Sequence, residues 1–206
     1  MMRFRALAIA TAFIPAISVA QAPQGTLGFY RFPSVHGNTV VFAAEGDLWE
    51  VALTGGLAHR LTSHPAEETD PVISPDGKTV AYTARYEGPA ALYTIPLTGG
   101  VPTRWTFDGD AATATGWTPD GKLLYKTLQY TSIPKFGMVQ LNLADGTRSV
   151  VPLAGASEGS FDASGKTLYF ARPGFHNQVT KHYTGGTARQ IWKYTMGAAE
   201  AVQLTG

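Results

Sequence analysis

One short segment recurs four times along this chain with small changes. It reads GNTVVF from Gly37, GKTVAY from Gly77, GKLLYK from Gly121 and GKTLYF from Gly165, so successive copies are 40, 44 and 44 residues apart. A second apolar segment follows each copy, at residues 47–53, 91–97, 137–143 and 190–196. Repeats of about 40 to 45 residues, built from alternating strands and Gly/Asp turns, are typical of β-propeller blades.

Each repeat contains four strand-like segments. In the second repeat, Val80 and Tyr82 alternate with smaller or polar residues, which is the period of two of a β-strand. Pro75 and Gly77 make the turn before it, because proline presets φ and glycine accepts a positive φ. We therefore predict an all-β fold, a β-propeller with four blades of four antiparallel strands, at about residues 29–62, 70–106, 113–153 and 158–205.

The third strand of each repeat carries an aromatic or apolar residue at an equivalent place. These residues are Trp49, Tyr93, Val139 and Trp192. Because the position recurs in every repeat, we expect the side chains to pack in the layers between neighbouring blades rather than to bind a ligand.

The fourth repeat has an unusually long connection between its second and third strands, residues 172–189. Connections of that length are often functional. This one contains aromatic and basic side chains, namely Phe175, His176, Lys181, His182 and Tyr183. Such a mixture suits a partner surface, so we expect the connection to pack against another part of a larger protein. A surface excursion without a partner is the alternative.

The first 22 residues have the pattern of a secretory signal peptide. Two arginines precede a small and apolar run at residues 6–19, and Ala20-Gln21-Ala22 is an A-x-A cleavage site. We expect cleavage after Ala22, a mature chain from Pro23, a periplasmic or secreted location and no membrane insertion afterwards. An uncleaved anchor is the alternative, but the run is shorter than the roughly 20 residues of a membrane-spanning helix. Without cysteine, the chain forms no disulfide and holds no cysteine-ligated metal.

Charge and motifs argue against several classes of function. With 16 Lys+Arg against 15 Asp+Glu, the chain lacks the basic stripe that nucleic-acid binding requires. None of the five histidines falls in a zinc motif, and no G-x-S-x-G elbow or phosphate-binding glycine loop is present. We therefore predict no catalytic residue, no cofactor and no metal site in this chain.

Two polar segments lie between the strands of the first and second repeats. Residues 67–70 (EETD) form a small acidic cluster, which we interpret as a solvated loop near the rim or channel mouth, since they lack the spacing of a calcium loop. Arg85, Tyr86 and Glu87 follow the second strand of the second repeat. Because such side chains can contact a peptide carboxylate and backbone, we take these three as candidate peptide contacts.

Several segments of the mature chain resemble the tricorn protease family, in its secreted bacterial branch. The fairly specific part is residues 30–68, with FPSVHG at 32–37, EGDLW at 45–49, RLT at 60–62 and HPAEE at 64–68. GWTPDG at 116–121 and KHYTGG at 181–186 extend the similarity into the third and fourth repeats. The SPDGK turn at 74–78 is shared by many propellers and adds little.

The resemblance implies a large serine peptidase with a six-bladed N-terminal propeller, a second propeller, a PDZ domain and a C-terminal catalytic domain. Residues 23–206 would then be part of the first propeller, guiding or gating peptides toward a catalytic domain beyond this chain. The implied partners are peptides or unfolded polypeptide and the remaining domains, with a homo-oligomer left open. The alternative is a non-enzymatic envelope scaffold, similar to the Tol-system propeller. An enzyme with its site on the propeller itself is disfavoured, because no convergent acid–base set is visible.

Overall fold

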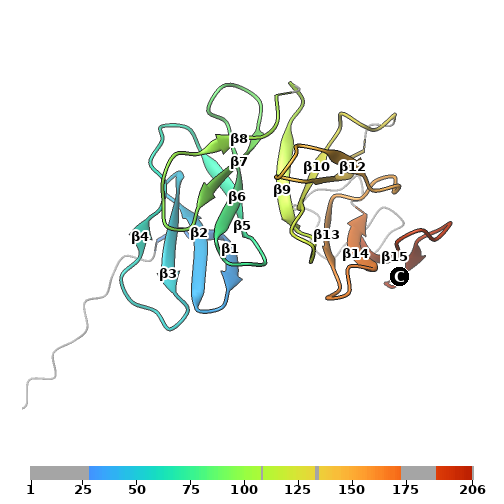
Figure 1. Cartoon of the computed structure of the whole chain (residues 1–206), viewed down its shortest axis with the longest axis horizontal. Helices are drawn as coiled ribbons and strands as arrows, with labels where there is room; N and C mark the ends of the chain where they lie inside the picture. The colour runs from blue at the N-terminus through green and yellow to red at the C-terminus, as the bar shows by residue number, and fades with distance from the viewer. Residues whose placement is uncertain (1–27, 108, 133–134, 173–188, 206) are drawn as a thin grey trace, which may run out of the picture.

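A computed structural model describes residues 28–107, 109–132, 135–172 and 189–205 (Figure 1). The described residues form sixteen strands in four antiparallel sheets of four, and none of them forms a helix that could cross a membrane. The prediction of an all-β fold with four four-stranded blades is confirmed. The expected signal peptide at 1–22 and the interior of the 172–189 connection, with His176 and His182, lie outside the described residues.

Each sheet consists of four strands that are consecutive in the sequence. Blade 1 contains β1 (Arg31–His36), β2 (Thr39–Ala44), β3 (Asp47–Ala52) and β4 (His59–Arg60). Blade 2 contains β5 (Glu68–Ile73), β6 (Thr79–Ala84), β7 (Ala91–Pro96) and β8 (Thr103–Arg104). Blade 3 contains β9 (Ala112–Trp117), β10 (Leu123–Thr127), β11 (Gly137–Leu141) and β12 (Arg148–Val150). Blade 4 contains β13 (Glu158–Phe161), β14 (Thr167–Arg172), β15 (Gln190–Thr195) and β16 (Val202–Gln203).

The four blades follow one another around an arc (Figure 1). The first strand of each blade is innermost, and close contacts join β1 to β5, β5 to β9 and β9 to β13. Because neighbouring strands are antiparallel, all connections between second and third strands emerge at the same end as the links from blade to blade. We call this end the top face. It contains the loop of the candidate residues Arg85, Tyr86 and Glu87.

The core lies between blades, in three separate layers. Val41 and Leu48 of blade 1 pack with Val80, Tyr82 and Tyr93 of blade 2. The next two layers have the same construction between blades 2 and 3 and between blades 3 and 4. Each sheet therefore buries both of its faces only where it has a neighbour on each side, which is the nearest-neighbour stabilisation of a repeat protein.

The expectation for the third-strand residues is confirmed at three of the four positions. Tyr93, Val139 and Trp192 lie in the first, second and third layers. Trp49 is the exception. It pairs across the strands with Phe42 on the face of blade 1 that points away from blade 2, where no other blade of the described chain covers it. Its indole instead donates to the Ala44 carbonyl at 3.0 Å and lies under the Arg60 guanidinium, 4.9 Å from the ring centroid.

A threonine hydroxyl completes the third strand in three blades. The outer strands β4, β8 and β16 have only two residues each, so they leave one amide of the third strand without a strand partner. A threonine hydroxyl accepts a hydrogen bond from this amide in each of the three blades. The Thr62 hydroxyl accepts from Leu48 at 2.8 Å, that of Thr106 from Leu92 at 2.9 Å, and that of Thr205 from Ile191 at 2.9 Å. Thr62 and Thr106 thus have a structural role, because the buried Leu48 and Leu92 need an acceptor for their amides, whereas the equivalent bond of Thr205 to Ile191 lies at an exposed site.

We expect Thr106→Val to destabilise the chain by about 1–3 kcal/mol, because it leaves the buried Leu92 amide without an acceptor. In a chain of this size the melting temperature falls by about 2–4 °C for each kcal/mol. The matched control is Thr205→Val, which removes the same hydrogen bond at an exposed site where water replaces it. Equal losses of melting temperature in the two variants, measured by circular dichroism, would contradict this assignment.

Candidate functional site

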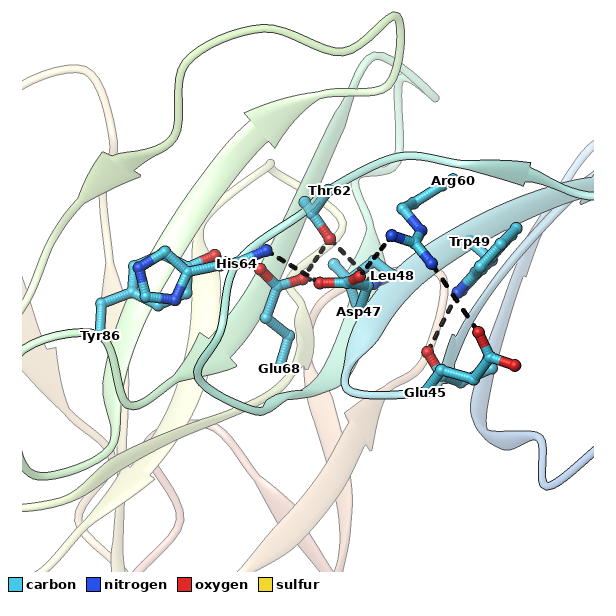
Figure 2. Close-up of polar contacts among 10 residues, drawn as sticks. Glu45, Asp47, Leu48, Trp49, Arg60, Thr62, His64, Glu68 and Tyr86 are labelled. Carbon is cyan, nitrogen blue, oxygen red and sulfur yellow. Dashed lines mark hydrogen bonds and ion pairs between the residues drawn. The ribbon is translucent and has the colours of Figure 1, made fainter.

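The most elaborate polar network of the described chain lies on the top face, at the junction of blades 1 and 2 (Figure 2). Three segments meet there: the turn from β2 to β3, the link 61–67 from blade 1 to blade 2, and the loop that follows β6. The turn begins at Glu45, whose φ of 56° is left-handed, and Gly46 continues it at 89°. This tight turn places Asp47 and Leu48 beneath the link between the blades.

Glu68 is the centre of the network. It begins β5 and is fully buried, with 0% of its surface exposed. Its carboxylate accepts hydrogen bonds from the Thr62 hydroxyl, from the Leu48 amide at 3.2 Å and from the Tyr86 hydroxyl. These donors come from both blades, so one carboxylate joins the end of blade 1 to the start and the β6–β7 loop of blade 2.

The prediction that residues 67–70 form a solvated loop is wrong for Glu68, Thr69 and Asp70, because all three belong to β5 and Glu68 is fully buried. The Glu68 carboxylate is bonded to Thr62 of the link from blade 1 and to the Tyr86 hydroxyl, and the Glu68 amide donates to the Gly46 carbonyl at 2.9 Å. Glu67 matches the prediction better, because it is exposed and pairs with Arg31 at 2.7 Å. A bulge beside Asp70, whose φ is 52°, interrupts the alternation of β5, so no periodic pattern in the sequence marks Glu68 as buried.

Burial shifts the pKa values of these groups. It raises the pKa of the Glu68 carboxyl, and the hydrogen bonds from Thr62 and Tyr86 offset part of that shift. Burial likewise raises the pKa values of Tyr82 and Tyr86. Both phenols are therefore neutral near pH 7. Tyr86 donates its one hydrogen to Glu68 and so accepts from the Tyr82 hydroxyl, 3.1 Å away.

A second carboxylate, that of Asp47, organises the outer part of the network. It accepts a hydrogen bond from the His64 amide at 3.0 Å and forms an ion pair with Arg60 at 3.4 Å. The His64 ring packs on Tyr86 with centroids 3.9 Å apart, and its Nδ1 accepts the Ala66 amide at 3.0 Å. The backbone of the link is therefore fixed by side chains on each side of it.

The three candidate peptide contacts occupy different surroundings. Arg85 is exposed on the top face. Tyr86 is half-buried and its hydroxyl is bound to Glu68, so only its ring is available to a ligand. Glu87 is exposed and pairs with Arg104 of β8. No pattern in the sequence indicates Arg104, because its pairing with Glu87 depends on how the loop folds toward the outer strand of its own blade.

An open groove of about 450 Å³ separates the outer parts of blades 1 and 2. Blade 1 contributes the segment Leu61, Thr62, Ser63 and His64, and blade 2 contributes Tyr86, Glu87, Tyr93, Ile95, Gly100, Pro102 and Arg104. The groove thus combines an aromatic floor with one ion pair. Ser63 has no hydrogen bond to the His64 ring in the described structure, so the two do not form a nucleophile–base pair. The described residues also contain no group of three or more acidic or histidine side chains placed to hold a metal ion.

Comparison with known proteins gives a consistent result. Residues 27–206 match the sequence model of the tricorn protease N-terminal β-propeller domain. Tricorn protease homolog 1 of Streptomyces coelicolor is 43% identical over 60 residues, which are 29% of this chain and 6% of that protein. The crystal structure of the tricorn protease is similar with a TM-score of 0.73 at 22% identity, covering 87% of this chain and 18% of that one.

The same fold occurs in TolB from Acinetobacter baumannii, with a TM-score of 0.68 at 18% identity, covering 86% of this chain and 44% of that one. At these identities the structural likenesses show the fold alone. In each of these comparisons the aligned part is less than half of the relative's own length.

Proposed function

We propose that this chain, which belongs to the family of tricorn protease N-terminal β-propeller domains, binds unfolded peptide segments and guides them toward a peptidase domain outside the chain. The observation that supports this most is the groove between blades 1 and 2. It opens beside the loop of Tyr86 and Glu87 and combines aromatic surface with polar groups, the composition that peptide-binding sites use.

The proposal includes a cellular location for the protein and separate roles for the propeller and the peptidase domain. Cleavage after Ala22 would place the protein in the periplasm or outside the cell, where peptides and unfolded polypeptides are its partners. The parent protein would be a serine peptidase whose catalytic residues lie outside this chain, with no cofactor held by the propeller. Peptide contact by Arg85, Tyr86 and Glu87 belongs to the same proposal.

A scaffold function is the second candidate, and the fold likeness to TolB favours it. The two functions differ in what they bind. A peptide guide recognises extended chain, whereas a scaffold recognises the folded surface of a partner, usually over about 1,200–2,000 Å².

We therefore expect residues 23–206 to bind reduced, carboxymethylated α-lactalbumin and not to bind native α-lactalbumin. Fluorescence anisotropy of the labelled α-lactalbumin measures both interactions. The same sample should leave peptides uncut and should not react with a fluorophosphonate probe, because the groove holds no base-activated serine. Binding of neither form would contradict the guiding function and leave the scaffold function in its place. Specific labelling of any serine would show that the catalytic site is on the propeller.

A further inference from the structure

The hydroxyl of Tyr93 is a buried polar group without a hydrogen-bond partner in the described structure. Tyr93 lies on β7, is only 4% exposed and contributes to the groove between blades 1 and 2. The two neighbouring tyrosines, in contrast, have hydrogen-bond partners for their hydroxyls. The Tyr82 hydroxyl bonds to that of Tyr86, which in turn donates to Glu68. A buried hydroxyl without a hydrogen-bond partner disfavours folding. The presence of such a hydroxyl on the wall of a groove therefore points to a ligand that supplies the missing partner.

The surroundings of this hydroxyl restrict the chemistry of that ligand. The Tyr93 ring packs on Tyr86 with centroids 4.5 Å apart, and His64 covers the same Tyr86 ring at 3.9 Å. Arg104 is the cross-strand partner of Tyr93 on β8, and Arg104 and Glu87, which both act electrostatically on the Tyr93 hydroxyl, pair with each other. Because that pair carries no net charge, the groove suits a neutral ligand with apolar surface and hydrogen-bonding groups rather than an anion.

We infer that the groove binds an extended peptide, holding one apolar or aromatic side chain against Tyr86 and Tyr93 while the Tyr93 hydroxyl donates to a main-chain carbonyl. This inference rests on the proposed function and names the place and the class of peptide. Glu87 lines the same groove and its side chain is 69% exposed, so its carboxylate, while paired with Arg104, also accepts a main-chain amide of the same peptide. Main-chain recognition with one apolar side chain favours unfolded polypeptide of many sequences.

The test uses two fluorescein-labelled, C-terminally amidated peptides, Gly-Ala-Ala-Phe-Ala-Ala-Gly and the same peptide with alanine in place of phenylalanine. Wild-type residues 23–206 should bind the first about tenfold more tightly than the second. Tyr93→Phe keeps the ring and removes only the hydroxyl. It should weaken binding of the phenylalanine peptide about five- to tenfold while the melting temperature stays the same or rises, because the unpaired group is gone.

The matched control is Tyr82→Phe, which removes a hydroxyl that is already bonded and lies outside the groove. It should lower the melting temperature and leave the affinity unchanged. Equal affinity in wild type and Tyr93→Phe, or an equal loss in Tyr82→Phe, would overturn the inference while peptide binding itself stands. If the wild-type chain binds neither peptide nor carboxymethylated α-lactalbumin, the proposed function fails, and this inference with it.

Discussion

Replacing Glu68 with alanine should lower the melting temperature by about 6–12 °C. The change leaves the Thr62 hydroxyl, the Tyr86 hydroxyl and one interaction of the Leu48 amide without their acceptor in a fully buried site. Leaving several buried donors unpaired costs about 3 kcal/mol, and each kcal/mol shifts the midpoint by about 2–4 °C in a chain of this size. Thermal unfolding followed by circular dichroism measures the effect. A drop of less than about 2 °C would show that the network contributes little.

Glu68→Gln tests the charge of this group, because glutamine fills nearly the same space and does not titrate, although its NH2 replaces one of the two oxygens that accept hydrogen bonds. Burial raises the pKa of Glu68 above its ordinary value of 4.5, so the folded state binds this proton more tightly than the unfolded state does. The stabilisation from this proton is complete below pH 4.5 and is lost as the pH rises through the raised pKa. Relative to wild type, Glu68→Gln should therefore become more stable from pH 4 toward pH 7. Parallel stability curves would contradict a raised pKa.

The second large effect concerns the face of blade 4 that points away from blade 3. Ile191 occupies the place of Leu48, Leu92 and Met138 in the other blades, which are each 0% exposed, yet Ile191 is 47% exposed. Tyr169 beside it is 46% exposed. At the other end of the arc, Val40, Phe42 and Val51 of blade 1 line an open hollow of about 390 Å³. Both end faces therefore have the composition of a layer between blades.

Exposed apolar sheet faces of this kind associate in water, so the chain of residues 23–206 should self-associate at tens of micromolar. Light scattering coupled to size exclusion measures the mass directly. The double variant Tyr169→Glu, Ile191→Lys should shift the chain toward a monomer. Val101→Lys is the control, since Val101 is 86% exposed in the connection between β7 and β8 and belongs to neither end face. A wild-type chain that stays monomeric at every concentration would contradict the prediction.

The sequence by itself determined the repeat architecture, because the signals for it are local. Period-two alternation within each strand and a glycine in each hairpin turn need no knowledge of neighbouring blades. Gly77, Gly121 and Gly165 have φ values of 70°, 82° and 69°, as the predicted turns require. Trp49 shows the limit of such local signals. Its place in the repeat predicts a side chain between two blades, but the described chain has no blade on that side of blade 1.

Only the tertiary structure decided which residues face which neighbour. The hairpin of blade 3 closes between Thr118 and Lys122, one residue earlier than the hairpin between Ser74 and Thr79. As a result Tyr125, and not Lys126 as the aligned glycines suggest, takes the buried place of Tyr82. A shift of one residue moves every side chain of a strand to the opposite face, and a difference of one residue in the turn is enough to cause it.

The candidate site depended on the tertiary structure even more. The burial of Glu68, the pairing of Glu87 with Arg104 and the unpaired hydroxyl of Tyr93 all arise where separate segments meet, between the blades or between a loop and an outer strand. Arg85, Tyr86 and Glu87 were found as a polar loop, but their roles follow from partners up to 18 residues away. Hydrogen-bond partners and solvent exposure are properties of packed surfaces, and one strand's sequence does not contain the surface that packs against it.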